Sequence, residues 1–381
     1  MVKIIKHNKL REMLKVHYEA KIPLWIQGGF GIGKSDVVKQ TAIEIAKAKN
    51  KQFLNWNKMT NEERRELAKN PKDKFVLVDI RLSDREPTDI KGLPDLSTNT
   101  ENVEWKVELW VKAIANKEFD GIVFFDEMNN APPSVLKSAY QIFLDRQVGE
   151  YSINDNVLLL GAGNRIEDKA DIFDVPLPLR DRYNEVELRT DDEVWVEWAI
   201  KEQINGMVIS FIKFKPDRLL CVDNDRVGKS TTPRGWARVN EIMKHLKISD
   251  KPTQEELDEC EDYVSATIGE GTATEFIAYI KLQRNIDLQQ ILKNPKLAED
   301  IKQVDLRYAL IGGLTEVYRK DKAKYISGVT DVCKYLEPEF VTLMLRMMKS
   351  IDTGFFMKNI TQQQTWKSYL KPKFEKYLLG N

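Results

Sequence analysis

The sequence is poor in cysteine and has no excess of charge of either sign. Its 381 residues include only three cysteines, Cys221, Cys260 and Cys333. Their spacing fits neither a zinc site nor an even set of disulfides, so we expect buried, reduced thiols in a cytoplasmic protein. Lys and Arg together number 59, and so do Asp and Glu. A net charge of zero argues against a protein that coats nucleic acid by bulk charge, while a local basic groove stays compatible with it.

Long apolar segments are also missing. No apolar run approaches the roughly 18 residues that a membrane-spanning helix needs. The first seven residues lack the apolar region of a secretory signal, so we expect neither a signal peptide nor a membrane protein. The hydrophobic fraction of 42% is nevertheless enough for packed cores and excludes a largely disordered chain. The length indicates two or three domains.

Apolar runs of strand length alternate with helical patterns over the first half of the chain. Four short apolar runs indicate buried strands, at residues 23–27, 75–80, 121–125 and 157–162. Strands that are apolar throughout and separated by helices are typical of a parallel sheet covered by helices on both faces. The sequence therefore predicts an α/β fold. It also predicts a polar insertion at 49–74, with a capping box at 60–63 that begins a short helix, and a loop or hairpin insertion at about 83–105.

After about residue 190 only helical patterns remain. Residues 190–193 are a predicted capping box and are followed by apolar residues at helical spacing. Pro233 is expected in the first turn of a further helix, because proline suits that position. We therefore expect three parts: an α/β domain over residues 1–190, a helical lid over 191–250 and a helical C-terminal region over 251–381.

A glycine-rich segment follows the first apolar strand and precedes a helical pattern. It satisfies the spacing G-x-x-x-x-G-K-[ST]. Its glycines let several backbone N–H groups converge on phosphate oxygens, and the next helix directs its N-terminus at the same anion. The lysine would contact the β- and γ-phosphates of ATP, and the serine hydroxyl would bind Mg²⁺. The predicted nucleotide-binding residues are Gly28, Gly29, Phe30, Gly31, Ile32, Gly33, Lys34 and Ser35.

Two acidic residues follow the predicted strand at 121–125. In a nucleotide hydrolase, a carboxylate at the end of the strand beside the phosphate loop holds Mg²⁺, usually through water. The next carboxylate can orient the attacking water and take its proton. The sequence therefore predicts that Asp126 holds the metal together with Ser35, and that Glu127 is the catalytic base.

These motifs resemble those of the AAA+ ATPases, and within them the MoxR group, over most of residues 10–240. Residues 161–164, Gly-Ala-Gly-Asn, resemble the sensor 1 segment, which implies that Asn164 lies between Glu127 and the γ-phosphate. Residues 177–183 resemble the segment that carries the arginine finger. This implies Arg182, with Arg180 as the alternative, as the residue that reaches the neighbouring subunit's site. Residues 232–236 resemble sensor 2, which implies that Arg234 contacts the nucleotide.

The resemblance also implies an assembly and a biological role. Residues 87–94 are similar to a MoxR segment whose inserted hairpin faces the central pore of related rings. An arginine finger needs a neighbour, so a homo-oligomer, a hexameric ring, is expected. Its hydrolysis of ATP would remodel a partner protein, often one with a von Willebrand factor A domain. The family often has an arginine where this chain has Asn130, so no role is carried over to that position.

Two other functions compete with this interpretation. A motor on nucleic acid would need basic residues in the hairpin, but residues 83–105 contain two basic and six acidic residues. A nucleotide switch without hydrolysis is disfavoured by the presence of Glu127 and Asn164. A basic, aromatic-rich tail near residues 366–377 either binds single strands or packs its aromatic side chains inward, and the second reading is preferred.

Overall fold

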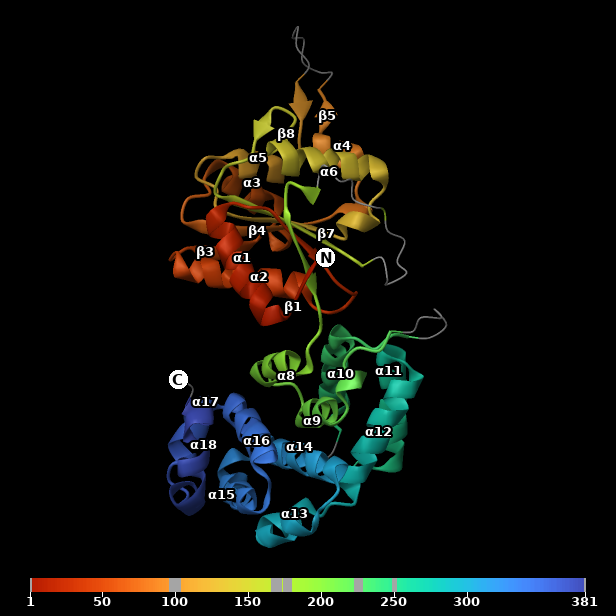
Figure 1. Cartoon of the computed structure of the whole chain (residues 1–381), viewed down its shortest axis with the longest axis vertical. Coiled ribbons are helices and arrows are strands. Elements are labelled where there is room, and N and C mark those ends of the chain that lie inside the picture. Colours follow the sequence, from red (N-terminus) through yellow and green to blue (C-terminus); the bar gives the residue numbers. More distant parts are fainter. Residues whose placement is uncertain are drawn as a thin grey trace. The chain divides into compact units, whose positions relative to one another are not determined.

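The computed structural model describes residues 2–95, 104–165, 173, 180–222, 229–248 and 252–379. The chain divides into two compact units, Met1–Thr190 and Asp191–Asn381. The first unit combines helices with a sheet, and the second is helical (Figure 1). One buried apolar cluster in the second unit extends from Trp195 to Phe374 and so runs across residue 250. The division into three parts with a border near 250 stays a prediction.

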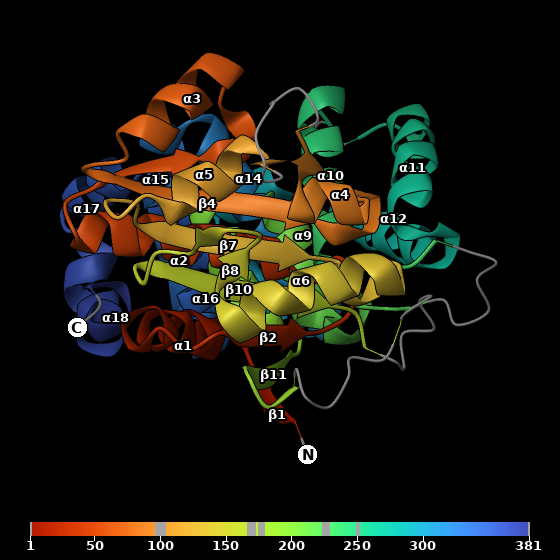
Figure 2. The ribbon, with the colours of Figure 1, turned by 90° about the horizontal axis from the view of Figure 1, so that it is seen from above.

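A seven-stranded parallel sheet forms the centre of the first unit. Across the sheet the order is β1 (Lys3–Ile5), β11 (Asn184–Leu188), β2 (Leu24–Gln27), β10 (Val157–Gly163), β7 (Gly121–Asp126), β4 (Lys74–Arg81) and β3 (Gln52–Asn55). All neighbouring strands pair in parallel. Figure 2 shows the strands side by side from β4 to β1. Gly161 lies opposite both Trp25 and Phe125, so β2, β10 and β7 end at the same edge of the sheet.

Helices cover both faces of this sheet, which confirms the predicted α/β fold. On one face lie α1 (His7–Ala20) and α2 (Lys34–Ala48), where the rings of Tyr18 and Phe75 are 5.5 Å apart. Four helices pack on the other face: α3 (Asn61–Lys69), α4 (Pro87–Lys91), α5 (Leu109–Ala115) and α6 (Pro133–Asp145). The predicted capping box of α3 is confirmed, because the side chains of Thr60 and Glu63 each accept a hydrogen bond from the other residue's backbone N–H.

Three strands of the sheet are not predicted by the apolar pattern. In β11 only Val186 and Leu188 are buried, so polar residues alternate with apolar ones and no continuous apolar run appears. At one edge β1 has three residues, and at the other edge β3 has none that is buried. The segment 49–74 is therefore more than a polar insertion, because β3 pairs in parallel with β4.

The first unit also contains several short elements between its main strands and helices. The predicted hairpin is present as β5 (Leu93–Pro94) paired antiparallel with β6 (Trp105–Lys106); residues 96–103 of this insertion lie outside the described residues. The same insertion contains the helical turn η2 (Leu82–Asp84) and α4. Further short elements are η1 (Trp56–Lys58), η3 (Met128–Asn130), β8 (Gln147–Val148) and β9 (Tyr151–Ser152).

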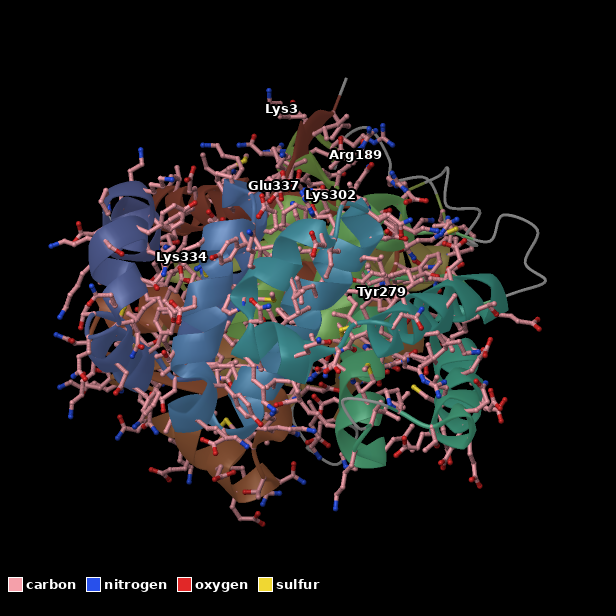
Figure 3. The ribbon with its side chains drawn as sticks, turned by 90° about the horizontal axis from the view of Figure 1, so that it is seen from below. Lys3, Arg189, Tyr279, Lys302, Lys334 and Glu337 are labelled. Atoms are coloured by element: carbon pink, nitrogen blue, oxygen red, sulfur yellow. The ribbon has the colours of Figure 1, made fainter. Side chains whose placement is uncertain are left out.

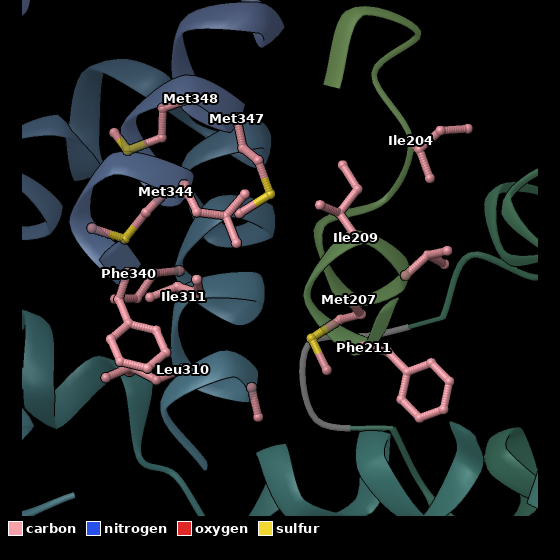
Figure 4. Packing of buried hydrophobic residues seen from close by; sticks show 14 of the residues in the cluster. Ile204, Met207, Ile209, Phe211, Leu310, Ile311, Phe340, Met344, Met347 and Met348 are labelled. Atoms are coloured by element: carbon pink, nitrogen blue, oxygen red, sulfur yellow. The ribbon is translucent and has the colours of Figure 1, made fainter. Parts of the chain in front are cut away.

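The second unit is built from helices throughout the part that the structure describes. They are α8 (Asp192–Lys201), α9 (Gly206–Phe214), η5 (Pro216–Arg218), α10 (Pro233–Leu246), α11 (Gln254–Ile268), α12 (Glu270–Arg284), α13 (Leu288–Lys293), η6 (Pro295–Asp300), α14 (Val304–Lys320), α15 (Lys322–Val332), η7 (Cys333–Tyr335), α16 (Pro338–Ile351), α17 (Thr353–Ile360), η8 (Trp366–Leu370) and α18 (Lys371–Leu379). Figure 4 shows apolar side chains of α9, α14 and α16 in the shared core. Polar and charged side chains surround these helices (Figure 3).

The beginning of α8 differs from the prediction by one residue. The N-cap is Asp191, whose carboxylate accepts a hydrogen bond from the N–H of Val194 at 3.0 Å. Aspartate is among the most favourable N-cap residues, so it takes this position in place of Thr190. None of the described helices is both long enough and apolar enough to cross a membrane.

Candidate nucleotide-binding site

The glycine-rich loop connects β2 to α2. Gly31 and Gly33 have φ angles of 68° and 92°, a region that residues with a Cβ rarely adopt. The N–H of Gly28 donates to the Gly163 carbonyl at 3.2 Å, and a Cβ at Gly28 would lie only 2.8 Å from the Leu188 carbonyl oxygen. The spacing of glycines thus corresponds to two left-handed backbone positions and one close approach of two strands.

Lys34 connects this loop to the end of β10. The side chain is buried, with 8% of its surface exposed. Its ammonium group donates to the carbonyls of Gly28 at 2.6 Å and Gly29 at 2.9 Å, and to Oδ1 of Asn164 at 3.3 Å. The loop therefore encloses a fixed positive charge, which is the group that nucleotide phosphates require.

Ser35 and Asp126 meet beside the loop. Ser35 lies in the first turn of α2 and Asp126 ends β7, and the serine Oγ donates to the aspartate Oδ2 at 2.6 Å. Among the described residues, no group of three or more His, Cys, Asp or Glu side chains is arranged to hold a metal ion. The Ser35 hydroxyl and the Asp126 carboxylate are oxygen donors, the ligand type that Mg²⁺ prefers, and could hold that ion.

Glu127 has an unusual backbone and a partner that the motifs do not predict. Its φ angle is 53°, which is uncommon for a residue other than glycine and is concentrated at functional sites. Its N–H donates to Oδ1 of Asp126 at 2.9 Å, and its Oε2 accepts from the Ser83 hydroxyl at 2.8 Å. Ser83 lies in η2, just past the end of β4. Its place directly after an apolar strand is the one signal in the sequence that could have pointed to it.

A pair of asparagines fixes the end of β10. The side chain of Asn129 accepts from the Asn164 N–H at 3.0 Å and donates to the Asn164 carbonyl at 2.7 Å. Asn164 Nδ2 in turn donates to Oδ1 of Asn130 at 3.2 Å. A Cβ at position 163 would lie 2.2 Å from Oδ1 of Asn129, which explains the glycine there. Asn129 and Asn130 are further residues of the site that its motifs do not predict.

Asp79 brings a third carboxylate to the same edge. It lies in β4, and its Oδ1 is buried and accepts no hydrogen bond within the described part of the chain. Burial, together with the negative charges of Asp126 and Glu127, raises the pKa of Asp79 to about 6. Ionising this carboxylate in the folded protein is therefore unfavourable.

Asp79→Asn should stabilise the protein in the absence of metal and nucleotide, and more so at higher pH. Because the pKa is raised on folding, the wild-type carboxylate costs stability progressively as the pH rises from its unfolded value of about 4 to about 6. We expect the gain in unfolding free energy to be about 1–2 kcal/mol larger at about pH 7.5 than at about pH 4.5. Denaturant unfolding measures it, with the exposed Glu66→Gln as control. A gain that is equal at both pH values would contradict the assigned cause.

The structure does not test the predicted roles of the three arginines. Arg180 and Arg182 are exposed, shortly before β11, while residues 174–179 of their segment lie outside the described residues. Within the described chain Arg182 makes no ion pair with Asp181 or Glu185. Arg234 is exposed in the first turn of α10 and is placed only within the second unit. The structure thus brings together Lys34, Ser35, Asp126, Glu127 and Asn164, and leaves the roles of the three arginines as predictions.

Comparisons with known proteins give distant likenesses. No protein-family model and no curated protein matches the chain. A similar solved structure is a Cytophaga hutchinsonii protein to which an ATPase activity has been attributed, with a TM-score of 0.35 and 12% identity over 91% of this chain and 82% of that one. Another is RuvB of Thermotoga maritima, a Holliday junction branch migration motor (TM-score 0.32, 14% identity, 75% and 74% covered). A third is PCH-2 of C. elegans (TM-score 0.32, 12% identity, 82% and 69% covered). Likenesses of this size assign neither family nor activity to the chain.

Proposed function

We propose that this chain is a Mg²⁺-dependent ATPase of the AAA+ type. The supporting observation is that residues from three separate motifs converge where β2, β7 and β10 end. The Ser35–Asp126 and Lys34–Asn164 hydrogen bonds join the three motifs directly. Ligands in open α/β sheets bind at the carboxyl ends of the strands, so the position as well as the residues suits a nucleotide.

Each residue would have a distinct role in hydrolysis. Lys34 would bind the β- and γ-phosphates, while Ser35 and Asp126 would hold Mg²⁺, which supplies charge neutralisation when bound. Glu127 would orient the attacking water and accept its proton. Asn164 lies within hydrogen-bond reach of the Lys34 ammonium and would orient the γ-phosphate from the opposite side.

We extend the proposal to a homo-oligomeric ring, a hexamer, that remodels a partner protein. Arg182 is exposed and makes no ion pair with its acidic neighbours within the described chain, which supports a role in the next subunit's site. Arg234 would contact the nucleotide from the helical lid. The MoxR-like motifs favour a protein substrate, and a partner with a von Willebrand factor A domain is part of this proposal. In the described part of the hairpin, Lys106 is paired with Asp95 at 2.8 Å, which does not favour a grip on nucleic acid.

Lys34→Ala tests the nucleotide site. The variant removes a buried ammonium group, and hydrogen bonds to charged groups contribute about 1.5–3 kcal/mol each. We therefore expect ATP affinity to fall about tenfold to hundredfold, measured by calorimetry or with a fluorescent nucleotide. Lys47→Ala, an exposed lysine of the same helix, is the matched control and should bind ATP normally. Wild-type affinity in a folded Lys34→Ala variant would remove the nucleotide site from this proposal.

A further inference from the structure

The C-terminal end of the second unit has an exposed basic side. Trp366, Leu370 and Phe374 are buried, so the tail packs its apolar and aromatic side chains inward, as preferred from the sequence. The exposed lysines, which we call the basic face, are Lys358, Lys367, Lys371, Lys373 and Lys376. Residues 353–379 contain these five lysines and a single acidic residue, Glu375. One end of a chain with zero net charge therefore carries a clear excess of positive charge.

Within residues 353–379 there is little acidic charge to balance the lysines. Glu375 approaches Lys371 at 4.0 Å, and this one carboxylate cannot balance the ammonium groups of Lys358, Lys367, Lys371 and Lys373. Lys373 lies over the ring of Tyr369, with its ammonium nitrogen 3.9 Å from the ring centre. Trp366 and Phe374 are buried and the Tyr369 ring is covered, so these three side chains offer no open aromatic face of the kind on which bases of a single strand stack.

α11 carries the opposite charge. Between residues 252 and 280 there is no Lys or Arg, while α11 alone contains six acidic residues. Four of them are exposed and form no ion pair within the described chain; we call Glu255, Asp258, Glu259 and Asp262 the acidic face. Their spacing of three and four residues places them along one side of the helix.

The two faces lie at opposite ends of the same unit. α11 packs against α10 and α12, whereas α18 packs against α16. Figures 1 and 3 both show α11 and the C-terminal helices on opposite sides of the second unit. A single copy therefore cannot bring its own acidic and basic faces together, but two copies can.

We propose that the acidic face of one copy binds the basic face of the next copy in a head-to-tail contact. A contact between two different faces leaves one of each free at the ends, so it continues from copy to copy and closes into a ring when the rotation permits. Complementary charges across such a surface set partner choice and the rate of encounter. The contact needs neither nucleotide nor Arg182, so it stands or falls independently of the proposed ATPase activity.

Charge exchange between the faces tests the contact. One variant carries Asp258→Lys, Glu259→Lys and Asp262→Lys, and the other carries Lys367→Glu, Lys371→Glu and Lys373→Glu. Each variant has two faces of the same sign, so we expect its self-association to weaken about tenfold or more. In an equimolar mixture both kinds of contact are again between opposite charges. Association should then return to near the wild-type strength, as measured by sedimentation velocity of the full chain without nucleotide at about 0.05 M salt.

Controls separate this contact from other effects of charge. The control variant carries Glu66→Lys, Glu118→Lys and Glu150→Lys at exposed positions of the first unit. It changes the net charge by as much as the acidic-face variant does and should leave association unchanged. Salt at about 1 M, where the screening length is about 3 Å, should weaken the wild-type contact. ATP binding by both variants should remain at wild-type strength.

A wild-type chain that stays monomeric at low salt, or a mixture that does not recover, overturns the contact. The proposed contact would also be overturned if a labelled oligonucleotide binds the wild type but not the basic-face variant, while the acidic-face variant self-associates as strongly as the wild type. The basic face would then bind nucleic acid.

Discussion

Arg182→Ala should bind ATP almost as tightly as the wild-type chain and hydrolyse it about 10³–10⁵-fold more slowly. An arginine finger stabilises the charge that develops on the transferred phosphoryl group in the transition state, and it adds much less to binding of the ground state. Lys34, Ser35 and Asp126 remain in the variant, so affinity should be preserved. Equilibrium nucleotide binding and phosphate release, measured on the same preparation, separate the two effects. Arg180→Ala separates the two candidates in the same exposed segment, because a loss of hydrolysis in that variant and not in Arg182→Ala would assign the finger to Arg180.

Mixing two inactive variants tests whether Arg182 acts in a neighbouring subunit. An Arg182→Ala subunit keeps its phosphate loop, and a Lys34→Ala subunit keeps its arginine. In a mixed assembly the second can therefore supply the finger to the first, and part of the activity should return. Activity per wild-type subunit should also rise with protein concentration as assemblies form. Activity that is independent of concentration, with no recovery on mixing, would indicate a monomeric ATPase and would remove the ring from the proposal.

Glu127→Gln should bind ATP and Mg²⁺ normally and lose about 10²–10⁴-fold in the rate of hydrolysis. The glutamine amide cannot accept the proton of the attacking water. Its oxygen can still accept the hydrogen bond from Ser83, which in the wild-type chain spans 2.8 Å, so the side chain should keep its position. The loss should therefore appear in the turnover rate and leave the affinity unaltered.

Single-turnover hydrolysis and equilibrium binding measure the two quantities for Glu127→Gln. Glu118→Gln, which removes an exposed carboxylate shortly before β7, is the control for the loss of one negative charge. Near-normal turnover in Glu127→Gln would mean that another group accepts the proton. Asp79 would then be the first residue to test, because its carboxylate is close enough to Glu127 for their charges to interact.

The central strands were predictable because both of their faces are buried. β7 and β10 are apolar along almost their whole length, and such runs stand out in a sequence. β3 and β11 keep part of their surface exposed, so their composition resembles that of loops and only pairing with distant strands defines them. The beginning of α8 differs by one residue because the spacing from Thr190 to Glu193 matches a capping box, whereas aspartate is the more favourable N-cap residue and Asp191 takes that position.

The candidate site divides in the same way. Lys34, Ser35, Asp126, Glu127 and Asn164 each belong to a short motif at the end of a strand, and the rule for parallel sheets brings those ends together. Ser83 and Asp79 belong to no such motif, since they reach the site through the register between β4 and β7, which pairs Arg81 with Asp126. Asn129 makes two hydrogen bonds to the backbone of residue 164. No spacing of residues in the sequence predicts this contact.

The position of β2 in the sheet has a consequence for synthesis of the chain. The strand that leads into the phosphate loop lies between β10 and β11, both of which come much later in the sequence. A ribosome adds about 5–20 residues per second, so β2 emerges many seconds before either neighbour exists. During that interval the apolar side chains of β2 have neither neighbouring strand to pack against. Pairing with β10 and β11 joins segments that are far apart in the sequence, and such pairing is a slow folding step. Nucleotide at the proposed site would therefore assist folding only once the first unit is almost complete, and chaperone protection would be most useful before that point.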